Sequence, residues 1–552
     1  MMQTLFTILS GLAIILLLLY RKIPYFVQDV MHARLIIWIS GQRAKFLQTT
    51  PYFTVLDRFL ELAKTQPAKP FIIFEDELFT YGDGDLQSNK VARALRQHAG
   101  LREGDTVALF LGNQPLFVWL AKVLIADAGV RGAVEEVLPS LRQKGIRVFI
   151  LGEACGSEGL EALSDKIQQA SDQPLSPQLR AQVKATSPTA YFYTSGTTGL
   201  PKATVSTEAK AWAAAFLLTH AHVGAQDRLY LTLPLYHMSG LHAGLHGAIE
   251  RGITVVLKRK FSASQFWADC RRHNVTVILY IGEILRYLCN TPAGADDRRH
   301  RVRIVVGNGL RADVWRLILQ RFGKIRITEF YGSSDGNTAL MNYPGRVGAV
   351  GKVNFYHRRV APYVLVQFDP EREELVRDAY GLCVQVPTGE TGLFLSKITA
   401  RTPFGGYLNN PEQTERKKVR DVVEKGDLFL NSGDLMKIDE DGFIFFQDRV
   451  GDTFRWKGEN VATTEVASIL TMMDSVLDSN VYGVQLPGHE GRAGMATLTL
   501  KEGKTLDCRE TFAHISHSLP QFAWPQFIRI QDFTTLRMNS KRVLHSPGFL
   551  AR

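Results

Sequence analysis

The sequence predicts an α/β protein with a large N-terminal domain, a small α+β C-terminal domain and one membrane-anchoring helix in front of them. Strand-like and helical segments alternate from about residue 190 to 335, which is typical of a parallel sheet with crossover helices. Short strands and turns dominate from about 345 to 447, and predict a small β-rich subdomain. The expected domains are a membrane anchor and interfacial segment at 1–45, a large domain at 46–448 and a small mobile domain at 449–552.

Length and composition narrow the class of protein. The 552 residues exceed one ordinary domain of ~100–200 residues. The net charge of +11 suits a polyanionic substrate or anionic lipid, although charge spread this evenly is also typical of a solvated surface. No basic arm is present, so we expect no nucleic-acid partner. The 5 cysteines are odd in number and widely spaced, which indicates a reduced intracellular protein without a cysteine metal site.

The N-terminus carries an almost wholly apolar run from Leu5 to Tyr20. With the four residues before it, the run is close to the ~20 residues that span a bilayer. No basic residue precedes it and no cleavage site follows, which disfavours a signal peptide. Arg21 and Lys22 come next, so we expect a single-pass anchor in an intracellular or plasma membrane, with the catalytic domains in the cytosol. The apolar run Leu35–Ile39 is expected in the membrane interface.

The elements of the large domain follow in order. Apolar residues at helical spacing predict a helix over 53–64, residues 71–81 are typical of a hairpin, and 86–98 of a second helix. A buried strand is expected at 106–111 and a short helix at 114–121. Later strands are expected at 253–257, 275–280, 303–306 and 326–330.

One junction in this domain departs from ordinary loop lengths. The helix at Gln114–Ala121 runs directly into an apolar segment, Lys122–Ala126. A helix-to-strand connection normally needs about 2–6 residues. The sequence therefore predicts a shortened structure here, and loss of a crossover from a parallel sheet would expose apolar surface.

The strongest chemical signal is YFYTSGTTGLPK, from Tyr191 to Lys202. An apolar approach leads into a loop of Ser, Thr and Gly that ends in a lysine. Glycines let the backbone approach an anion, hydroxyls and amides donate hydrogen bonds, and the lysine adds a charge. The segment predicts a phosphate loop of a kind other than GxxxxGK[ST]. A flexible Gly/Thr linker is the alternative.

This loop resembles that of the adenylate-forming superfamily, which includes acyl-CoA synthetases, luciferases and peptide-synthetase adenylation domains. Other segments narrow the resemblance: YIGEILRYL from Tyr280, RIVVGNGLRADVW from Arg303, EFYGSSDGN from Glu329, RVGDTFRWKGENVATTEV from Arg449 and YGVQLPGHEGRAGM from Tyr482. Together they are similar to the fatty-acid transport protein and very-long-chain acyl-CoA synthetase family, over residues 50 to about 530.

The resemblance implies a role for each matching position. The phosphates of ATP would be held by Thr194, Ser195, Gly196, Thr197, Thr198, Gly199 and the catalytic Lys202. The nucleoside would contact Gly307, Asn308, Gly309, Tyr331, Gly332, Ser334, Asp434 and Arg449, with Tyr331 on the adenine and Asp434 on the ribose hydroxyls. Asp335 would bind Mg²⁺. The family usually has Thr and Glu where this chain has Ser334 and Asp335, and the shorter acid could shift the metal.

Each of these roles has a structural alternative. Tyr331 could be a core aromatic, Asp434 a turn residue, and Gly307–Gly309 an ordinary strand-to-helix turn. His237, in PLYHMSG, either gates the acyl pocket as a catalytic residue or is a satisfied core histidine. Tyr280 and Gly282 either line the acyl tunnel as substrate-binding residues or belong to a helix N-terminus with ordinary packing.

The implied mechanism has two steps. A fatty-acid carboxylate attacks the α-phosphorus of ATP and pyrophosphate leaves; the coenzyme A thiol then attacks the acyl-adenylate after the small domain rotates. In the superfamily a lysine of the small domain assists the first step. Here Met538 falls at that position in an ungapped match, and Lys541 is the candidate replacement.

The main hypothesis is therefore a membrane-bound fatty-acid–CoA ligase that uses ATP, Mg²⁺ and coenzyme A and couples activation to fatty-acid uptake. Its expected partners are the fatty acid and membrane lipid, and a homo-oligomer is left open. One alternative is a ligase for another carboxylic acid, branched or of polyketide type. The other is a catalytically weak fatty-acid transport or binding protein, which Met538, Asp335 and the short junction would favour.

Overall fold

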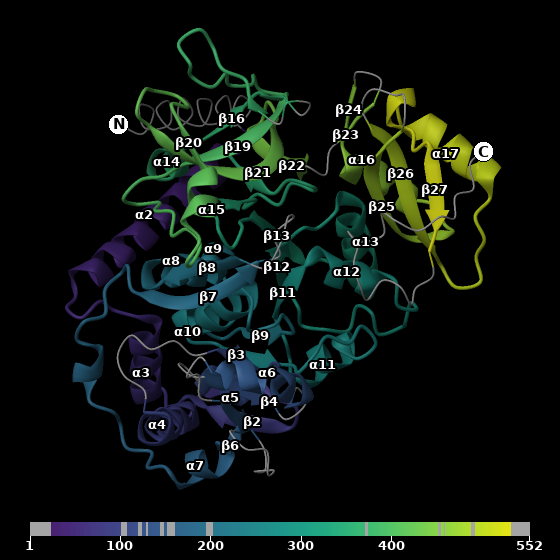
Figure 1. The fold of residues 1–552 in the computed structure, drawn as a ribbon. Helices are drawn as coiled ribbons and strands as arrows, with labels where there is room; N and C mark the ends of the chain where they lie inside the picture. The colour runs from purple at the N-terminus through teal and green to yellow at the C-terminus, as the bar shows by residue number, and fades with distance from the viewer. Residues whose placement is uncertain are drawn as a thin grey trace, which may run out of the picture.

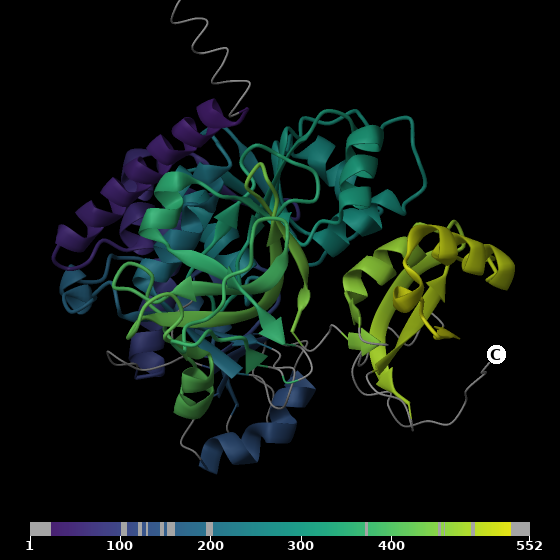
Figure 2. The same ribbon diagram turned by 90° about the horizontal axis from the view of Figure 1, so that it is seen from above.

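The structure is a computed structural model of the chain. It describes residues 24–100, 108–119, 124–127, 131–143, 148–151, 160–194, 202–369, 372, 374–450, 454–456, 459–486 and 492–531. Figure 1 shows a large body and a smaller C-terminal body beside it, and Figure 2 shows the same arrangement from above.

The largest sheet runs through the middle of the large body. Its strand order is β14 (Leu340–Met341), β13 (Arg326–Tyr331), β12 (Ile304–Asn308), β11 (Val277–Ile281), β9 (Arg228–Leu231), β10 (Thr254–Leu257), β1 (Pro70–Phe74) and β2 (Glu77–Thr80). The strands from β13 to β1 are parallel, and the edge strands β14 and β2 are antiparallel. Runs of Val, Ile and Leu buried on both faces suit a parallel sheet. The predicted sheet and hairpin are confirmed.

Helices cover this sheet. They are α3 (Val55–Thr65), α4 (Tyr81–His98), α8 (Glu208–Ala215), α9 (Leu217–His220), the π-helix η3 (Ser239–His246), α10 (Gly247–Arg251), α11 (Phe266–Arg272), α12 (Gly282–Cys289) and α13 (Ala312–Phe322). The first two begin at capping boxes, formed by Thr54 with Asp57 and by Thr80 with Asp83. Because Thr80 caps it, α4 begins earlier than the predicted residue 86.

A second parallel sheet contains the unusual junction. Its order is β3 (Leu109–Phe110), β4 (Leu124–Asp127), β5 (Val148–Leu151) and β6 (Leu160–Ala162), with α5 (Pro115–Trp119), α6 (Arg131–Gln143), α7 (Ser164–Gln169) and η2 (Pro177–Arg180) around it. A helix and a strand lie at the predicted places, as α5 and β4, but residues 120–123 between them lie outside the described residues, so the absence of a loop stays a prediction. Residues 111–123 connect β3 to β4, which is about the dozen that a parallel crossover needs. Strands β3 and β4 are thus parallel neighbours joined by a connection of ordinary length.

Antiparallel strands form the predicted β-rich region. The order is β15 (Gly351–Lys352), β22 (Phe443–Arg449), β21 (Leu428–Ile438), β19 (Thr391–Lys397) and β16 (Tyr363–Val366), and β20 (Lys418–Arg420) also pairs with β21. Strands β17 (Phe368–Asp369) and β18 (Glu374–Leu375) pair separately, and α14 (Phe355–Val360) and α15 (Pro411–Arg416) complete the region. Strands β7 (Pro188–Thr194) and β8 (Lys202–Thr207) form an antiparallel hairpin.

The C-terminal body has a core of its own. It contains the pair β23 (Phe454–Trp456) and β24 (Glu459–Val461), and a sheet of β25 (Val476–Gln485), β26 (Arg492–Leu500) and β27 (Phe527–Ile530). Helices α16 (Thr463–Thr471), α17 (Cys508–Ser518) and η4 (Gln521–Ala523) pack on these strands. One hydrophobic cluster extends from Phe454 to Ala523, separate from the cluster around the large sheet. The α+β character predicted for this part is confirmed.

Helix α2 (Phe26–Gln48) lies along the outside of the large body (Figure 2). It buries Ala33, Ile36 and Ile39, while Ile37 and Trp38 are about half exposed at 50% and 46%. Among the residues with a described structure, none of the helices combines the length and apolar character needed to cross a bilayer. The predicted anchor, Leu5–Tyr20, lies outside the described residues.

Candidate active site

The phosphate-loop motif lies at the tip of the β7–β8 hairpin. Thr194 and Lys202 are register partners, so the hairpin brings the two ends of the loop together. The residues between them, including Ser195, Gly196, Thr197, Thr198 and Gly199, lie outside the described residues. Backbone bonds of 3.3 Å from Val205 N to Gly406 O and 2.9 Å from Leu408 N to Ala203 O fix β8 against the β-rich region. The two ends of the motif, Thr194 and Lys202, are therefore held in a hairpin that is fixed to the β-rich region.

The loop lysine faces residues of the β-rich region. Lys202 Nζ donates to Gln413 Oε1 at 2.8 Å and lies 5.7 Å from the centroid of the Tyr407 ring. Tyr407 in turn donates its hydroxyl to Asp335 Oδ2 at 2.6 Å. Tyr407 thus connects the predicted phosphate lysine to the predicted metal carboxylate.

Asp335 lies among cations. Lys417 Nζ is 3.7 Å from Asp335 Oδ2, and Lys210 Nζ donates to the backbone oxygen of Ser334 at 2.7 Å. Burial alone would raise the pKa of Asp335, but Lys417 and the Tyr407 hydroxyl outweigh it and hold the pKa below its ordinary value. Burial lowers the pKa of Lys210 to about 8, against the opposing effect of Asp335. Asp335 is therefore an ionised carboxylate at neutral pH.

Tyr331, Asp434 and Arg449 form the second group. The Tyr331 hydroxyl donates to Asp434 Oδ2 at 2.5 Å, and Arg449 Nε donates to Asp434 Oδ1 at 3.1 Å. Asp434 is only 4% exposed, and its position in β21 pairs it in register with Arg449 in β22. Burial raises the pKa of Asp434, while Tyr331 and Arg449 oppose that rise. Asp434 belongs to a strand, so the turn-residue alternative is wrong.

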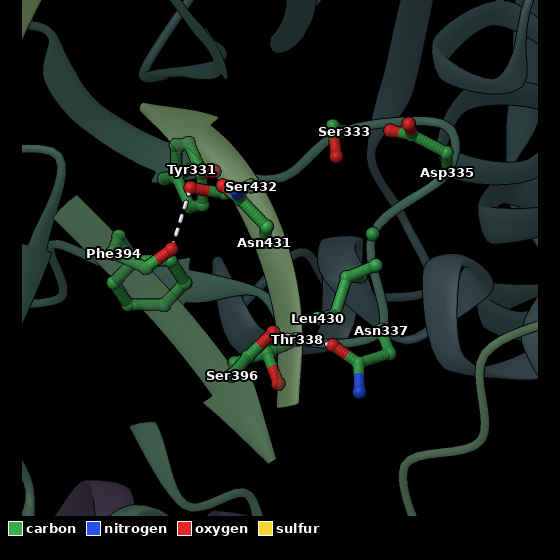
Figure 3. Close-up of a pocket in the computed structure, with 11 residues that line it drawn as sticks. Tyr331, Ser333, Asp335, Asn337, Thr338, Phe394, Ser396, Leu430, Asn431 and Ser432 are labelled. Atoms are coloured by element: carbon green, nitrogen blue, oxygen red, sulfur yellow. Dashed lines mark hydrogen bonds between the residues drawn. The ribbon is translucent and has the colours of Figure 1, made fainter. Parts of the chain in front are cut away.

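A small cavity separates the two groups (Figure 3). Its volume is about 10 Å³, which is room for about one water molecule. Tyr331 and Ser432 lie on one side of it and Asp335 on the other, and Ser396 and Leu430 also line it. Asn337 Nδ2 donates to the backbone oxygens of Lys397 and Thr402 at 3.1 and 2.9 Å, which fixes the loop after Asp335.

The predicted adenine segment is the turn from β12 into α13. Gly309 has φ +77°, a backbone conformation that favours glycine. A Cβ on Gly282 would lie 1.8 Å from the backbone oxygen of Gly309, so the backbone at the start of α12 is in direct contact with this turn. The segment is thus a strand-to-helix turn, and its contact with the adenine stays a prediction.

The remaining predicted residues are more scattered. His237 is exposed, so the core-histidine alternative is wrong; the buried histidine of this segment is His242, on η3. Tyr280 is 1% exposed and donates its hydroxyl to Glu329. Gly332 and Ser334 lie on the loop between Tyr331 and Asp335. Lys541 lies outside the described residues.

Five residues of the site were missed by sequence reasoning: Lys210, Glu329, Tyr407, Gln413 and Lys417. Each contacts a predicted residue through the fold rather than through a local motif. The sequence carries only an indirect signal for them. A lysine, a glutamate or a tyrosine in the core of a domain needs a hydrogen-bonding or charged partner.

The donor set fits a magnesium ion that is shared with phosphates. Within the described part of the chain, no three His, Cys, Asp or Glu side chains gather to hold a metal by themselves. Mg²⁺ usually binds through one or two carboxylates plus substrate phosphates. Asp335 is an ionised carboxylate, and Tyr407 contacts both Asp335 and Lys202. A single carboxylate close to the predicted phosphate lysine meets that requirement.

Comparison with known proteins decides the family. A family model for AMP-binding enzymes matches residues 59–384. Long-chain fatty acid transport protein 2 of Rattus norvegicus is 48% identical over an alignment that covers 100% of this chain and 94% of the relative. The chain belongs to the long-chain fatty acid transport protein family. Long-chain fatty acid transport protein 6 of Mus musculus is 42% identical, with 92% of this chain and 87% of the relative covered.

Solved structures show the same fold at low identity. The anthranilate CoA ligase AuaEII in complex with anthranoyl-AMP superposes with a TM-score of 0.73 at 20% identity, covering 87% of this chain and 93% of the other. The o-succinylbenzoate CoA synthetase of Bacillus subtilis in complex with ATP and magnesium has a TM-score of 0.67 at 22% identity, with 86% and 95% covered. This fatty acid transport protein thus has the adenylate-forming fold that the sequence predicted.

The alignment with the rat fatty acid transport protein, at 583 positions, is longer than this 552-residue chain. The relative therefore contains residues that have no counterpart here.

Proposed function

We propose that this fatty acid transport protein uses ATP to convert long- or very-long-chain fatty acids into acyl-CoA through an acyl-adenylate, and so traps fatty acid taken up at a membrane. The observation that carries the proposal is a pair of contacts on either side of one small cavity: Tyr407 joins Lys202 to Asp335, and Tyr331 bonds Asp434. The chain is also related over its whole length to a long-chain fatty acid transport protein.

The described side chains suggest a division of tasks. Lys202 neutralises phosphate charge as pyrophosphate departs, and Gln413 and Tyr407 hold it at the base of the loop. Asp434 accepts from the ribose hydroxyls, with Tyr331 and Arg449 keeping its two oxygens in place. The ring of Tyr331, set edge-on to Phe394 at 5.5 Å, offers a fixed face for the adenine.

Asp335 is the proposed ligand of Mg²⁺, which when bound would neutralise charge on the phosphates. Tyr407 and Lys417 orient the carboxylate, and Lys210 holds the neighbouring backbone at Ser334. These contacts fix the position of the Asp335 carboxylate. They therefore compensate for its side chain, which is shorter than that of the glutamate usual in the family.

We also propose that residues 449–552 move as a unit, so that the small domain serves both half-reactions with Lys541 as its catalytic lysine. Coenzyme A would then reach the adenylate after rotation, which keeps water away from it. His237 as a gate, and Tyr280 with Gly282 near the acyl path, remain part of this proposal.

The test is a half-reaction assay on the full chain in detergent. With ATP, Mg²⁺ and a long-chain acid we expect pyrophosphate release, and with coenzyme A added we expect acyl-CoA. Lys202→Met should lower kcat/KM by about 100-fold or more, as loss of a charge-stabilising donor does. A substrate panel completes the test, since a strong preference for a branched or other acid would replace fatty acid as the substrate.

The second candidate is a fatty-acid binding or transport protein with little turnover. Met538 at the position of the family's lysine, together with the aspartate at 335, favours it. Absence of pyrophosphate release with intact binding of a fluorescent fatty acid would establish this candidate in place of the ligase.

We further propose that the chain is anchored by residues 1–20 and that α2 rests in the membrane interface. Helix α2 follows the apolar run directly, and its outer side exposes Val27, Met31, Ile37 and Trp38 at 46–60%. Arg34 lies on the same side and suits anionic headgroups.

Brominated lipids test this placement on the full chain in vesicles. We expect brominated lipids to quench part of the tryptophan emission of the parent. This quenching should be lost in Trp38→Phe and retained in Trp524→Phe, a change in the small C-terminal domain. Equal quenching of the two variants would place α2 away from the lipid.

A further inference from the structure

The carboxyl ends of β11, β12 and β13 place three residues side by side. Tyr280 pairs in register with Gly307, and Gly307 pairs with Glu329. In a parallel sheet, register neighbours point their side chains to the same face. Tyr280 and Glu329 therefore flank Gly307 on one face, directly beneath the predicted adenine turn.

The two side chains meet across the strand between them. The Tyr280 hydroxyl donates to Glu329 Oε2, and the backbone N–H of Leu310 donates to Glu329 Oε1 at 2.9 Å. Tyr280 and Glu329 are each only 1% exposed, so water does not compete for these bonds. One buried carboxyl group thus ties β11 to the turn that follows β12.

Gly307 makes this bridge possible. A Cβ at position 307 would lie 2.7 Å from Cγ of Tyr280 and 2.2 Å from its backbone oxygen. Any side chain there would displace the tyrosine ring from its path toward Glu329. The glycine of the adenine segment therefore has a second role, which is to leave room for the Tyr280–Glu329 pair.

We propose that Glu329 is a positioning residue for the nucleotide: its carboxyl group holds the turn Gly307–Leu310 in the shape that receives the adenine. The inference rests on the proposed function, because it takes that turn as the adenine site. It adds a residue that belongs to none of the nucleotide-contacting positions, and it gives Tyr280 a role in nucleotide binding in addition to any contact with the acyl chain.

The protonation state of Glu329 is part of the argument. Burial raises its pKa to about 8, although hydrogen bonds from Tyr280 and from the N–H groups of Leu310 and Gly309 oppose the rise. Tyr280 is the titratable side chain that faces it among the described residues. Below pH 8 the group is a neutral acid, and its own O–H can then donate to the tyrosine oxygen in place of the bond that Tyr280 donates to the ionised form. Gln can imitate the neutral acid, because its amide oxygen accepts from Leu310 and its amide N–H donates to the tyrosine oxygen.

The experiment measures ATP affinity directly, by calorimetry on the full chain, so that it does not depend on turnover. We expect Glu329→Gln to bind ATP within about twofold of the parent at pH 7, and Glu329→Leu to bind about tenfold more weakly, since it leaves buried donors unpaired. Fatty-acid affinity should stay unchanged in both. Tyr280→Phe, a smaller change that should fold in any case, is expected to weaken ATP binding by about threefold.

Two controls separate positioning from general damage. Glu250 is another buried acid, bonded to Thr219 at 2.6 Å and far from the turn in the sequence; Glu250→Gln should leave ATP affinity unaltered. As pH rises through 8, ATP affinity of the parent should fall while that of Glu329→Gln stays level. Parental affinity in both Tyr280→Phe and Glu329→Leu, or matching pH profiles for parent and Glu329→Gln, would overturn the inference. If the parent itself binds no ATP, the proposed function fails instead.

Discussion

At the scale of single residues, the site depends on side chains that hold other side chains. Lys202, Tyr331, Asp335 and Asp434 could be predicted, because each lies in a local motif that resembles a known one. Tyr407 and Lys417 could not be predicted in this way. Tyr407 contacts Asp335 across 72 positions of the sequence, and Lys417 comes close to Asp335 only because β20 and β21 pack beside it. Distances of this kind are set by the packing of sheets, which no local pattern records.

Tyr407→Phe tests the orientation of the metal carboxylate. Loss of the hydroxyl leaves Asp335 without its 2.6 Å donor, and we expect the Mg²⁺ concentration for half-maximal activity to rise about tenfold, as for other residues that orient a metal ligand. The measurement is a Mg²⁺ titration at saturating ATP. Tyr380→Phe, at a tyrosine that is 80% exposed, serves as the control. An unchanged titration would mean that Lys417 orients the carboxylate alone.

Asp434→Asn tests the ribose contact. The parent should prefer ATP to 2′-deoxy-ATP, because a buried acceptor left without its hydroxyl partner is costly. The variant should lose most of this preference and show a KM for ATP at least about tenfold higher. Asp427→Asn changes another buried aspartate, which accepts from backbone N–H groups, and should keep the preference. A preference retained by Asp434→Asn would remove Asp434 from the ribose.

At the scale of elements, close contacts between backbones position the adenine turn. The start of α12 and the turn after β12 approach so closely that only glycine fits at 282. The strands of the large sheet could be predicted from alternating apolar segments. The start of α4 could not be predicted, because the Thr80 capping box determines it.

A pair of glycine substitutions tests this packing. Gly282→Ala places a Cβ 1.8 Å from the oxygen of Gly309 and should lower the free energy of unfolding by about 1–3 kcal/mol or more, with weaker ATP binding. Gly41→Ala, in the middle of α2 with no atom within 4 Å of the added carbon, should raise it by about 0.5–1 kcal/mol. Thermal and urea denaturation measure both. Similar stabilities would contradict the close approach.

At the scale of the whole molecule, two arginines of the large domain are among the residues that contact the small domain. Arg286 on α12 donates to the backbone oxygen of Leu477 at 3.0 Å and lies 3.8 Å from Asp478, and Arg311 at the start of α13 donates to the oxygen of Ser468 at 3.2 Å. The two-body arrangement could be predicted from the sequence. The contacts between the bodies could not, because they join segments about 160–190 residues apart.

Arg286→Ala should loosen the small domain and expose the connection after Arg449. We expect tryptic cleavage there to become several-fold faster, because protease attack follows the population of opened states. Arg299→Ala, an exposed arginine paired with Asp296, should cleave at the parental rate. Equal rates for the two variants would show that other contacts set the position of the small domain.

The place of Arg449 has a consequence for the order of events. It is the last residue of β22, it bonds the carboxylate proposed to accept the ribose, and the chain leaves for the small domain immediately after it. The proposed rotation of that domain would therefore begin at a residue that is proposed to hold the nucleotide. Nucleotide occupancy and domain orientation must then bias each other by equal free energies, so that whichever position favours bound AMP is also the position that AMP favours.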